Sequence, residues 1–274
     1  MRYFKREEEA NQMATEYQTI LTRREGAAQI ITMNRPERRN AVSTRMMDEI
    51  AAAATRAEED PAIRAVIITG GEKFFSAGAD LNEALAVKSP NAGIEYLGRW
   101  HRLNATLENL AKPVIAAIEG FCMTGGCEMA MACDVRVAGE GASFAITSAR
   151  IGTVAGAGGT QRLPRIVGTA KALELMFAAE PIDAAEAYRI GLINRLVAAG
   201  SALKEAQAMV AVYEKRAPLS HALIKRAVRQ GMQMDLASGL ELETFLVTTI
   251  YGTEDKNEGI SAFLEKREPS FKGR

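Results

Sequence analysis

The chain has few of the side chains that bind transition metals or crosslink a fold. It contains 3 cysteines and 2 histidines in 274 residues. Cys122, Cys127 and Cys133 show no C-x-x-C spacing, and the histidines are far apart in sequence. Zinc sites need several such ligands at short spacings. We therefore expect no metal site and no disulfide framework, and the unpaired cysteines favour a reducing compartment, the cytoplasm.

The chain also lacks an excess of charge and a long apolar run. Its 34 basic and 34 acidic residues give a formal net charge of zero, which offers no electrostatic basis for binding nucleic acid or an anionic membrane. No stretch approaches the roughly 18 apolar residues of a transmembrane helix. Residues 1–14 carry charges of both signs and no apolar signal-peptide core. We predict a polar extension there, and neither nucleic-acid nor membrane binding.

The remaining chain alternates apolar strands with amphipathic helices, which is typical of an α/β fold. The predicted strands cover residues 17–22, 27–33, 65–69, 114–118 and 135–138, and the first helices cover residues 43–57 and 96–110. Residues 81–91 are polar and contain Ser89-Pro90, so a mobile loop is expected there. Beyond residue 158 the pattern predicts successive helices without strands.

The most informative stretch follows the apolar strand Val114–Ile118. The pair Gly125-Gly126 lies where the next helix begins, and Glu128 lies just inside its first turn. The first amides of a helix have no intrahelical acceptor, and at glycine another molecule can approach them closely. Free donors beside a carboxylate indicate a site that stabilises a developing oxyanion. The alternative is a simple strand-to-helix turn with an exposed glutamate.

Two further stretches have a related character. Residues 74–81, Phe-Phe-Ser-Ala-Gly-Ala-Asp-Leu, form a small-residue turn after a strand, and residues 31–41 precede them. Together with residues 156–162 and 253–259, these motifs resemble the crotonase superfamily, the enoyl-CoA hydratase/isomerase family, over residues 17–274. The resemblance implies a spiral of repeated β-β-α units over residues 15–200. It also implies a helical C-terminal region, residues 201–274, that packs onto neighbouring subunits in trimers or hexamers.

The resemblance also implies catalytic roles. The backbone amides of Ala79 and Gly125 would hold the carbonyl oxygen of an acyl-CoA thioester. Glu128 matches the family carboxylate that deprotonates the attacking water, and the amide of Gly156 matches a donor to that water. Coenzyme A is then part of the substrate, and no separate cofactor is expected.

Six residues resemble family positions that bind coenzyme A or close the site: Arg39, Ala77, Asp80, Leu81, Tyr251 and Lys266. The carbonyls of Ala77 and Leu81 would accept from the adenine amino group. Arg39 would approach the phosphates, or is simply a solvated arginine. Tyr251 and Lys266 would close the site, in some relatives from a neighbouring subunit, or serve helix packing and solvation.

Ser148 is a departure from the family pattern. It occupies the position of the second carboxylate, which moves the proton at the α-carbon in two-glutamate hydratases. A serine hydroxyl can hold a water but cannot act as a general acid of matched strength. Three activities stay open: hydration or dehydration of an enoyl-CoA with Glu128 as sole carboxylate, acyl-CoA binding without catalysis, and thioester hydrolysis or isomerisation on the same scaffold.

Overall fold

The computed structural model describes residues 17–274, so the predicted extension at residues 1–14 lies outside the described residues. The strands are β1 (Ile20–Glu25), β2 (Ala28–Met33), β3 (Ala65–Thr69), β4 (Val114–Ile118), β5 (Phe121–Met123), β6 (Val135–Gly139), β7 (Ser143–Ala145), β8 (Ile182–Asp183) and β9 (Arg195–Val197). The α-helices are α2 (Thr44–Glu59), α3 (Leu81–Ala86), α4 (Pro90–Asn109), α5 (Gly125–Ala132), α6 (Gly159–Val167), α7 (Thr169–Ala178), α8 (Ala184–Arg189), α9 (Ala202–Tyr213), α10 (Pro218–Gly231), α11 (Leu236–Tyr251) and α12 (Glu254–Glu265). Two short 3-10 helices, η1 (Pro36–Arg38) and η2 (Ser148–Ile151), complete the elements.

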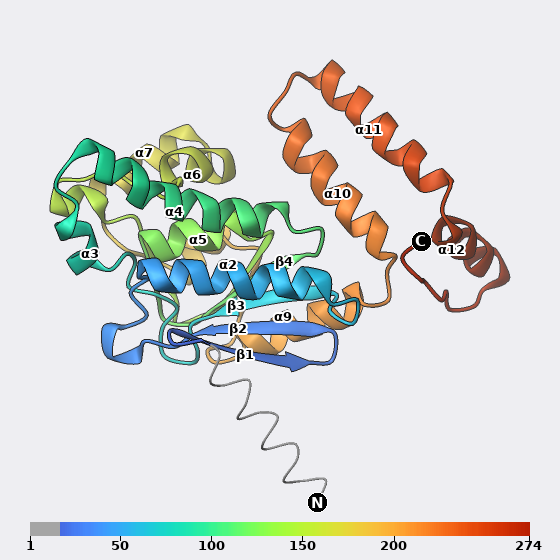
Figure 1. Ribbon diagram of the computed structural model, residues 1–274, viewed down its shortest axis with the longest axis horizontal. Helices are drawn as coiled ribbons and strands as arrows, with labels where there is room; N and C mark the ends of the chain where they lie inside the picture. Colours follow the sequence, from blue (N-terminus) through green and yellow to red (C-terminus); the bar gives the residue numbers. More distant parts are fainter. Residues whose placement is uncertain (1–16) are drawn as a thin grey trace, which may run out of the picture.

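These strands form two sheets. The larger has the order β1-β2-β3-β4-β6-β9 and is parallel except for the β1–β2 hairpin, and the smaller has the order β5-β7-β8. Consecutive units β4-β5-α5 and β6-β7-α6 each place one strand in the large sheet and the next in the small sheet (Figure 1). The predicted α/β fold of repeated β-β-α units is therefore confirmed.

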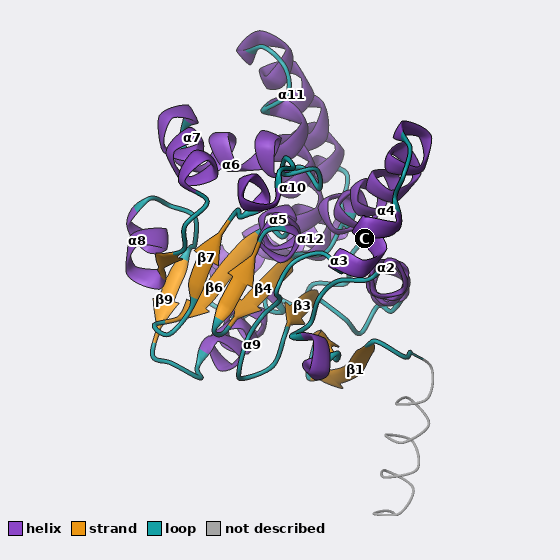
Figure 2. Cartoon of the chain, turned by 90° about the vertical axis from the view of Figure 1, so that its left-hand side faces the viewer, coloured by secondary structure: helices purple, strands orange, loops and turns teal. Residues whose placement is uncertain are grey.

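The central strands of the large sheet are buried on both faces, as expected for parallel strands covered by helices. Alternate residues of a strand point to opposite faces, so Val66 and Ile68 join one apolar cluster and Ile67 joins the other. Figure 2 shows α9 on one face of the sheet and α5 on the other. Ala206 and Val210 of α9 pack in the second cluster. α9 lies within the predicted C-terminal region, and it packs directly on the sheet.

Two expectations about local structure are wrong. Residues 81–91 do not form a loop: α3 begins after Asp80 and α4 begins at Pro90, after Ser89. Asp80 accepts from the amide of Asn82 and Ser89 from that of Ala92, so both act as N-caps, and proline is favourable at the first helical position. The region beyond residue 158 also contains strands, because β8 pairs with β7 and β9 pairs with β6.

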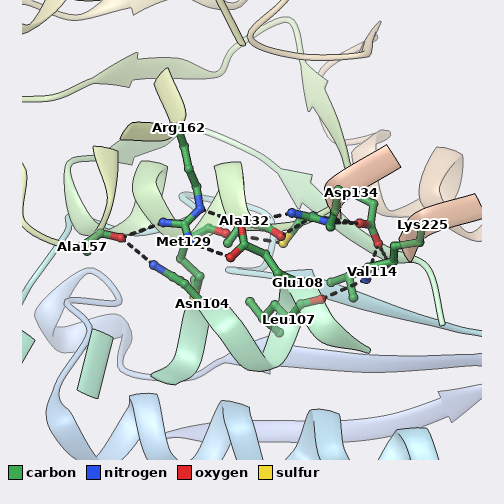
Figure 3. Close-up of polar contacts among 12 residues, drawn as sticks. Asn104, Leu107, Glu108, Val114, Met129, Ala132, Asp134, Ala157, Arg162 and Lys225 are labelled. Carbon is green, nitrogen blue, oxygen red and sulfur yellow. Dashed lines mark hydrogen bonds and ion pairs between the residues drawn. The ribbon is translucent and has the colours of Figure 1, made fainter. Parts of the chain in front are cut away.

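The last three helices lie at one end of the molecule. Figure 1 shows α10 and α11 side by side, with α12 beyond them. Lys225 and Arg229 of α10 bind Asp134 at 2.7 and 2.8 Å, and Arg229 also binds Glu108 of α4 at 3.1 Å (Figure 3). These ion pairs fix α10 to the body of the fold. Among residues 17–274, every helix is too short or too polar to span a bilayer.

Candidate active site

A cavity of about 190 Å³ lies where the two glycine turns, α4 and the loop after η2 meet. The five residues expected to be catalytic all line it: Ala79, Gly125, Glu128, Ser148 and Gly156. They come from three separate stretches of the chain, and the fold brings them around one space. Among residues 17–274, Glu128 is the only acidic residue that lines the cavity.

Ala79 and Gly125 line this cavity from two adjacent turns. Ala79 lies in a bridge with Val42, but the bonds of that bridge use the carbonyl of Gly78 and the amide of Asp80. Gly125 is the first residue of α5, where an amide has no intrahelical acceptor. Within residues 17–274 neither amide donates to a protein acceptor. A Cβ atom built on Gly125 would lie 3.2 Å from the nitrogen of Ala79, so the two donors are close neighbours.

A small hydrogen-bond network holds the Ala79 turn. The buried hydroxyl of Ser76 donates to the carbonyl of Asn40 at 2.7 Å and accepts from the amide of Gly78 at 3.1 Å. The side-chain amide of Asn40 in turn donates to the carbonyl of Phe75 at 3.2 Å. Because the turn is fixed from both sides, the Ala79 amide keeps its direction without a ligand.

The Gly125 turn packs against the buried indole of Trp100. A Cβ atom on Gly125 would lie 2.7 Å from Cη2 of Trp100, closer than real Cβ contacts come. Only glycine therefore fits at position 125, where the start of α5 packs against the indole of Trp100. Trp100 and Gly125 are 25 positions apart in the sequence, so the order of residues alone does not reveal that they are in contact.

Glu128 is buried, with 2% of its surface exposed, so the alternative of an exposed glutamate is wrong. Its Oε1 accepts from the amide of Gly159 at 2.7 Å. Burial raises the pKa of the carboxyl, while backbone hydrogen bonds from Gly159 and Ala157 and the charge of Arg162 lower it, and the net shift is upward. A raised pKa brings a carboxylate closer to the strength of a general base that works near neutrality.

Arg162 anchors the loop that lies next to this carboxylate. It binds Glu108 through two hydrogen bonds of 2.7 Å, and it donates to the carbonyl of Ala157 at 3.2 Å (Figure 3). The side chain of Asn104 donates to the same carbonyl at 2.7 Å. The loop that carries Gly156 and Ala157 is therefore anchored to α4 and α6 next to Glu128.

Ser148 and Gly156 complete the wall of the cavity. Ser148 is the first residue of η2 and is 4% exposed. A Cβ atom on Gly156 would lie 2.8 Å from Cδ2 of Leu97, and its amide donates to no acceptor within the described residues. A free amide and a small hydroxyl thus lie on the same cavity as Glu128.

The residues expected to bind coenzyme A fall into two groups. Ala77 and Leu81 line the cavity. Asp80 does not line it, because its carboxylate binds Arg35 at 2.9 Å and caps α3, and both contacts hold its pKa below the usual range against the effect of burial. Arg39 is exposed outside the cavity wall. The remaining two, Tyr251 at the end of α11 and Lys266 after α12, also lie outside it.

The cysteines and His101 take no part in this wall. Cys122, Cys127 and Cys133 are free and buried. Burial raises the pKa of the Cys122 thiol well above its usual value, and it raises the pKa of the Cys133 thiol to about 12. Such thiols are poor nucleophiles. His101 is exposed on α4. Within residues 17–274, no cluster of histidine, cysteine and acidic side chains is arranged to hold a metal ion.

Gly159 has a role that the sequence reading did not assign. A Cβ atom there would lie 2.9 Å from Oε1 of Glu128, so the absence of a side chain lets the amide reach the carboxylate. Gly159 belongs to the motif at residues 156–162, and that motif is the one sequence feature that pointed to this position.

Comparison with known proteins identifies the family of this chain. The enoyl-CoA hydratase/isomerase family matches residues 23–274. A probable enoyl-CoA hydratase of Mycobacterium bovis is 40% identical over 93% of this chain and 98% of its own, and a crotonyl-CoA hydratase of Syntrophomonas wolfei is 38% identical over the same shares. The crystal structure of an enoyl-CoA hydratase subunit from Geobacillus kaustophilus superposes with a TM-score of 0.90 at 35% identity, covering 95% of this chain and all of that one. The chain belongs to the enoyl-CoA hydratase/isomerase family, the crotonase superfamily, whose members are acyl-CoA enzymes.

Proposed function

We propose that this enzyme adds water to an enoyl-CoA thioester, or removes it in reverse, with Glu128 as its only catalytic carboxylate. The observation that carries the proposal is the pair of free amides, Ala79 and Gly125, on one cavity with a buried glutamate of raised pKa. The Syntrophomonas relative is a crotonyl-CoA hydratase, which supports the same reaction.

The thioester oxygen would accept hydrogen bonds from both amides. A water held by Glu128 and the amide of Gly156 attacks the β-carbon, and one of its protons passes to Glu128. The electron pair of the double bond moves to the thioester oxygen as an enolate, which the amides stabilise. One such donor is worth about 3 kcal/mol of barrier. The enolate then collapses as Glu128 returns the proton to the α-carbon.

Ser148 distinguishes this mechanism from one with two carboxylates. Since the described part of the chain places no second acid on the cavity wall, one carboxyl group must first accept a proton and then donate it. A buried carboxyl of raised pKa suits both steps better than an exposed one, because its neutral form is less costly. The serine hydroxyl contributes a hydrogen bond to water or substrate.

The nucleotide end of the substrate would follow the rim formed by Ala77 and Leu81, whose carbonyls accept from the adenine amino group. Arg39 is exposed and lies beside the Ala77 turn in space, because its carbonyl accepts from the Ala77 amide at 3.0 Å, and it would meet the phosphates. Asp80 contributes by fixing this rim through Arg35. Tyr251 and Lys266 would act only from a neighbouring subunit.

Loss of the enoyl-thioester absorbance of crotonyl-CoA tests the proposal, with free thiol measured in parallel. We expect the absorbance to fall without thiol release. Glu128→Gln should abolish turnover and keep affinity for the thioester, since it removes the base but neither amide. Glu140→Gln, at an exposed site outside the cavity, is the matched control. Thiol release would indicate a hydrolase, binding without either signal would indicate a binder, and full activity of Glu128→Gln would refute the assigned base.

We further propose that residues 201–274 mediate assembly into a trimer or a pair of trimers. Large apolar side chains are exposed along α10, α11 and α12: Ile224, Val228, Met232, Leu236, Leu240, Phe245, Tyr251, Phe263 and Leu264. Exposed apolar faces of this extent favour burial against another protein surface. Light scattering should give three or six times the monomer mass, and a monomer at micromolar concentration would refute assembly.

A further inference from the structure

The residue directly before the Gly125 amide has an unusual backbone. Thr124 has φ +39° and ψ −108°, in a region that favours glycine. A non-glycine residue in such a conformation costs about 1–3 kcal/mol and persists only when its surroundings hold it there. Strain of this kind next to a proposed oxyanion donor requires a specific compensating contact.

The side chain of Thr124 supplies that contact. Its hydroxyl lies 2.7 Å from the hydroxyl of Thr147 and accepts from the amide of Thr147 at 3.1 Å. Its own amide donates to the carbonyl of Ala145 at 2.7 Å, and its carbonyl accepts from the amide of Glu128 at 2.8 Å. Every polar group of Thr124 is therefore engaged, and the two hydroxyl contacts join the first turn of α5 to the segment that leads into Ser148.

The position of this pair relates it to the chemistry. Thr124 precedes Gly125, Thr147 precedes Ser148, and all four residues line the cavity. A peptide plane connects Thr124 to the Gly125 nitrogen, so the ψ of Thr124 sets the direction of that N–H. A free glycine at position 124 would reach several orientations, whereas the hydroxyl contact selects one.

We propose that the Thr124–Thr147 hydroxyl pair is a positioning device that aims the Gly125 amide at the thioester oxygen and fixes Ser148 relative to it. This inference rests on the proposed hydration mechanism and adds two residues to it. Neither threonine exchanges a proton with the substrate. Because a donor is most valuable where charge has developed, misdirecting it lowers kcat more than it raises KM.

The test compares Thr124→Val, Thr147→Val, Thr124→Gly and Thr124→Ser, with Thr55→Val as control. Valine keeps the shape of threonine and removes the hydroxyl, while serine restores it. Thr55 is an exposed threonine of α2 whose hydroxyl bonds only the carbonyl of Ala51. We expect kcat with crotonyl-CoA to fall by about tenfold or more in both valine variants and in Thr124→Gly, with KM changed by less than about threefold. Thr124→Ser and Thr55→Val should stay within about twofold of wild type.

Thr124→Gly separates positioning from stability, because it relieves the strain and still removes the hydroxyl. A second readout is the absorbance of bound 4-dimethylaminocinnamoyl-CoA, whose band moves to longer wavelength when donors polarise its thioester carbonyl. We expect a red shift with wild type and Thr124→Ser, and a smaller shift with both valine variants at similar affinity.

Wild-type kcat and wild-type red shift in Thr124→Val and Thr147→Val would overturn the inference while leaving the hydratase intact. If Thr124→Val fails to fold, Thr147→Val removes the same contact from the other side. Absence of both hydration and the red shift in the wild type would instead refute the proposed function.

Discussion

Replacing Gly159 with alanine should disable the catalytic carboxylate while leaving the fold intact. The added Cβ atom would lie 2.9 Å from Oε1, 3.0 Å from Cγ of Glu128 and 3.1 Å from Cβ of Ala155. Ordinary contacts begin near 3.4 Å, so the glutamate must move by several tenths of an ångström. The hydrogen bond of 2.7 Å from the Gly159 amide to the carboxylate must then lengthen or bend.

The expected effect is much larger on rate than on stability. Gly159 has no positive φ and begins α6, so alanine suits its backbone and gains about 0.5–1 kcal/mol of helix propensity. Crowding of the buried pocket costs about 1–3 kcal/mol, which leaves a small net loss of stability. A displacement of about 1 Å at a reacting group can cost a factor of about 100, so we expect kcat to fall by about tenfold to a hundredfold.

The assay is crotonyl-CoA hydration at saturating substrate, with thermal unfolding of the same samples. Gly141→Ala is the matched control, because a Cβ atom there meets nothing within 4 Å and its φ is not positive. We expect Gly141→Ala to keep wild-type kcat. Wild-type kcat in Gly159→Ala would show that the position of the Glu128 carboxylate does not limit the reaction, and the mechanism would be refuted.

Further predictions concern pH, a missing carboxylate and the docking of α10. Burial raises the pKa of Glu128, so kcat should fall as the pH drops through a value above the ordinary glutamate range. A pH profile of kcat whose acidic limb lies in the ordinary glutamate range would contradict this. The same raised pKa contributes stability that is present at low pH and is lost as the pH rises through the raised pKa. The free energy of unfolding of Glu128→Gln should therefore increase relative to that of the wild type as the pH rises. Ser148→Glu should increase crotonyl-CoA hydration by supplying a second carboxylate, and no gain in a folded variant that binds the thioester would show that this group is not limiting. Asp134→Ala leaves Lys225 without a carboxylate partner and Arg229 with Glu108 alone. It should lower the free energy of unfolding in urea by about 2 kcal/mol, with Asp134→Asn intermediate, and an unchanged midpoint would contradict the role of these ion pairs.

Short-range sequence signals predicted several strands and helix starts correctly. The strand Val114–Ile118 was predicted with its observed bounds, and the helix after it begins at Gly125 as expected. Ser43 caps α2 through a bond from the amide of Met46 at 3.2 Å. Apolar runs, caps and glycines act within a few residues, which makes them readable in one sequence.

The errors have two physical causes. Ser89-Pro90 was interpreted as a break, although the same dipeptide forms an N-cap and a first helical residue when α4 follows. The strand β9 has only 3 residues and exists because β6 offers it an edge, which is a tertiary cause that local pattern does not contain. The motifs predicted the residues around the cavity. The contacts that Gly159, Trp100 and Thr147 make with these residues join positions 23 to 31 residues apart, which local pattern does not reveal.

The central claim is that the amides of Ala79 and Gly125 bind the thioester oxygen of the substrate. Infrared difference spectroscopy of crotonyl-CoA, labelled with ¹³C at the thioester carbonyl and bound to Glu128→Gln, measures that contact directly because this variant holds the substrate unreacted. We predict a carbonyl band at lower frequency than for the same thioester in buffer, as two hydrogen bonds polarise the carbonyl. A band at the buffer frequency, in a sample with the ligand bound, would contradict the account.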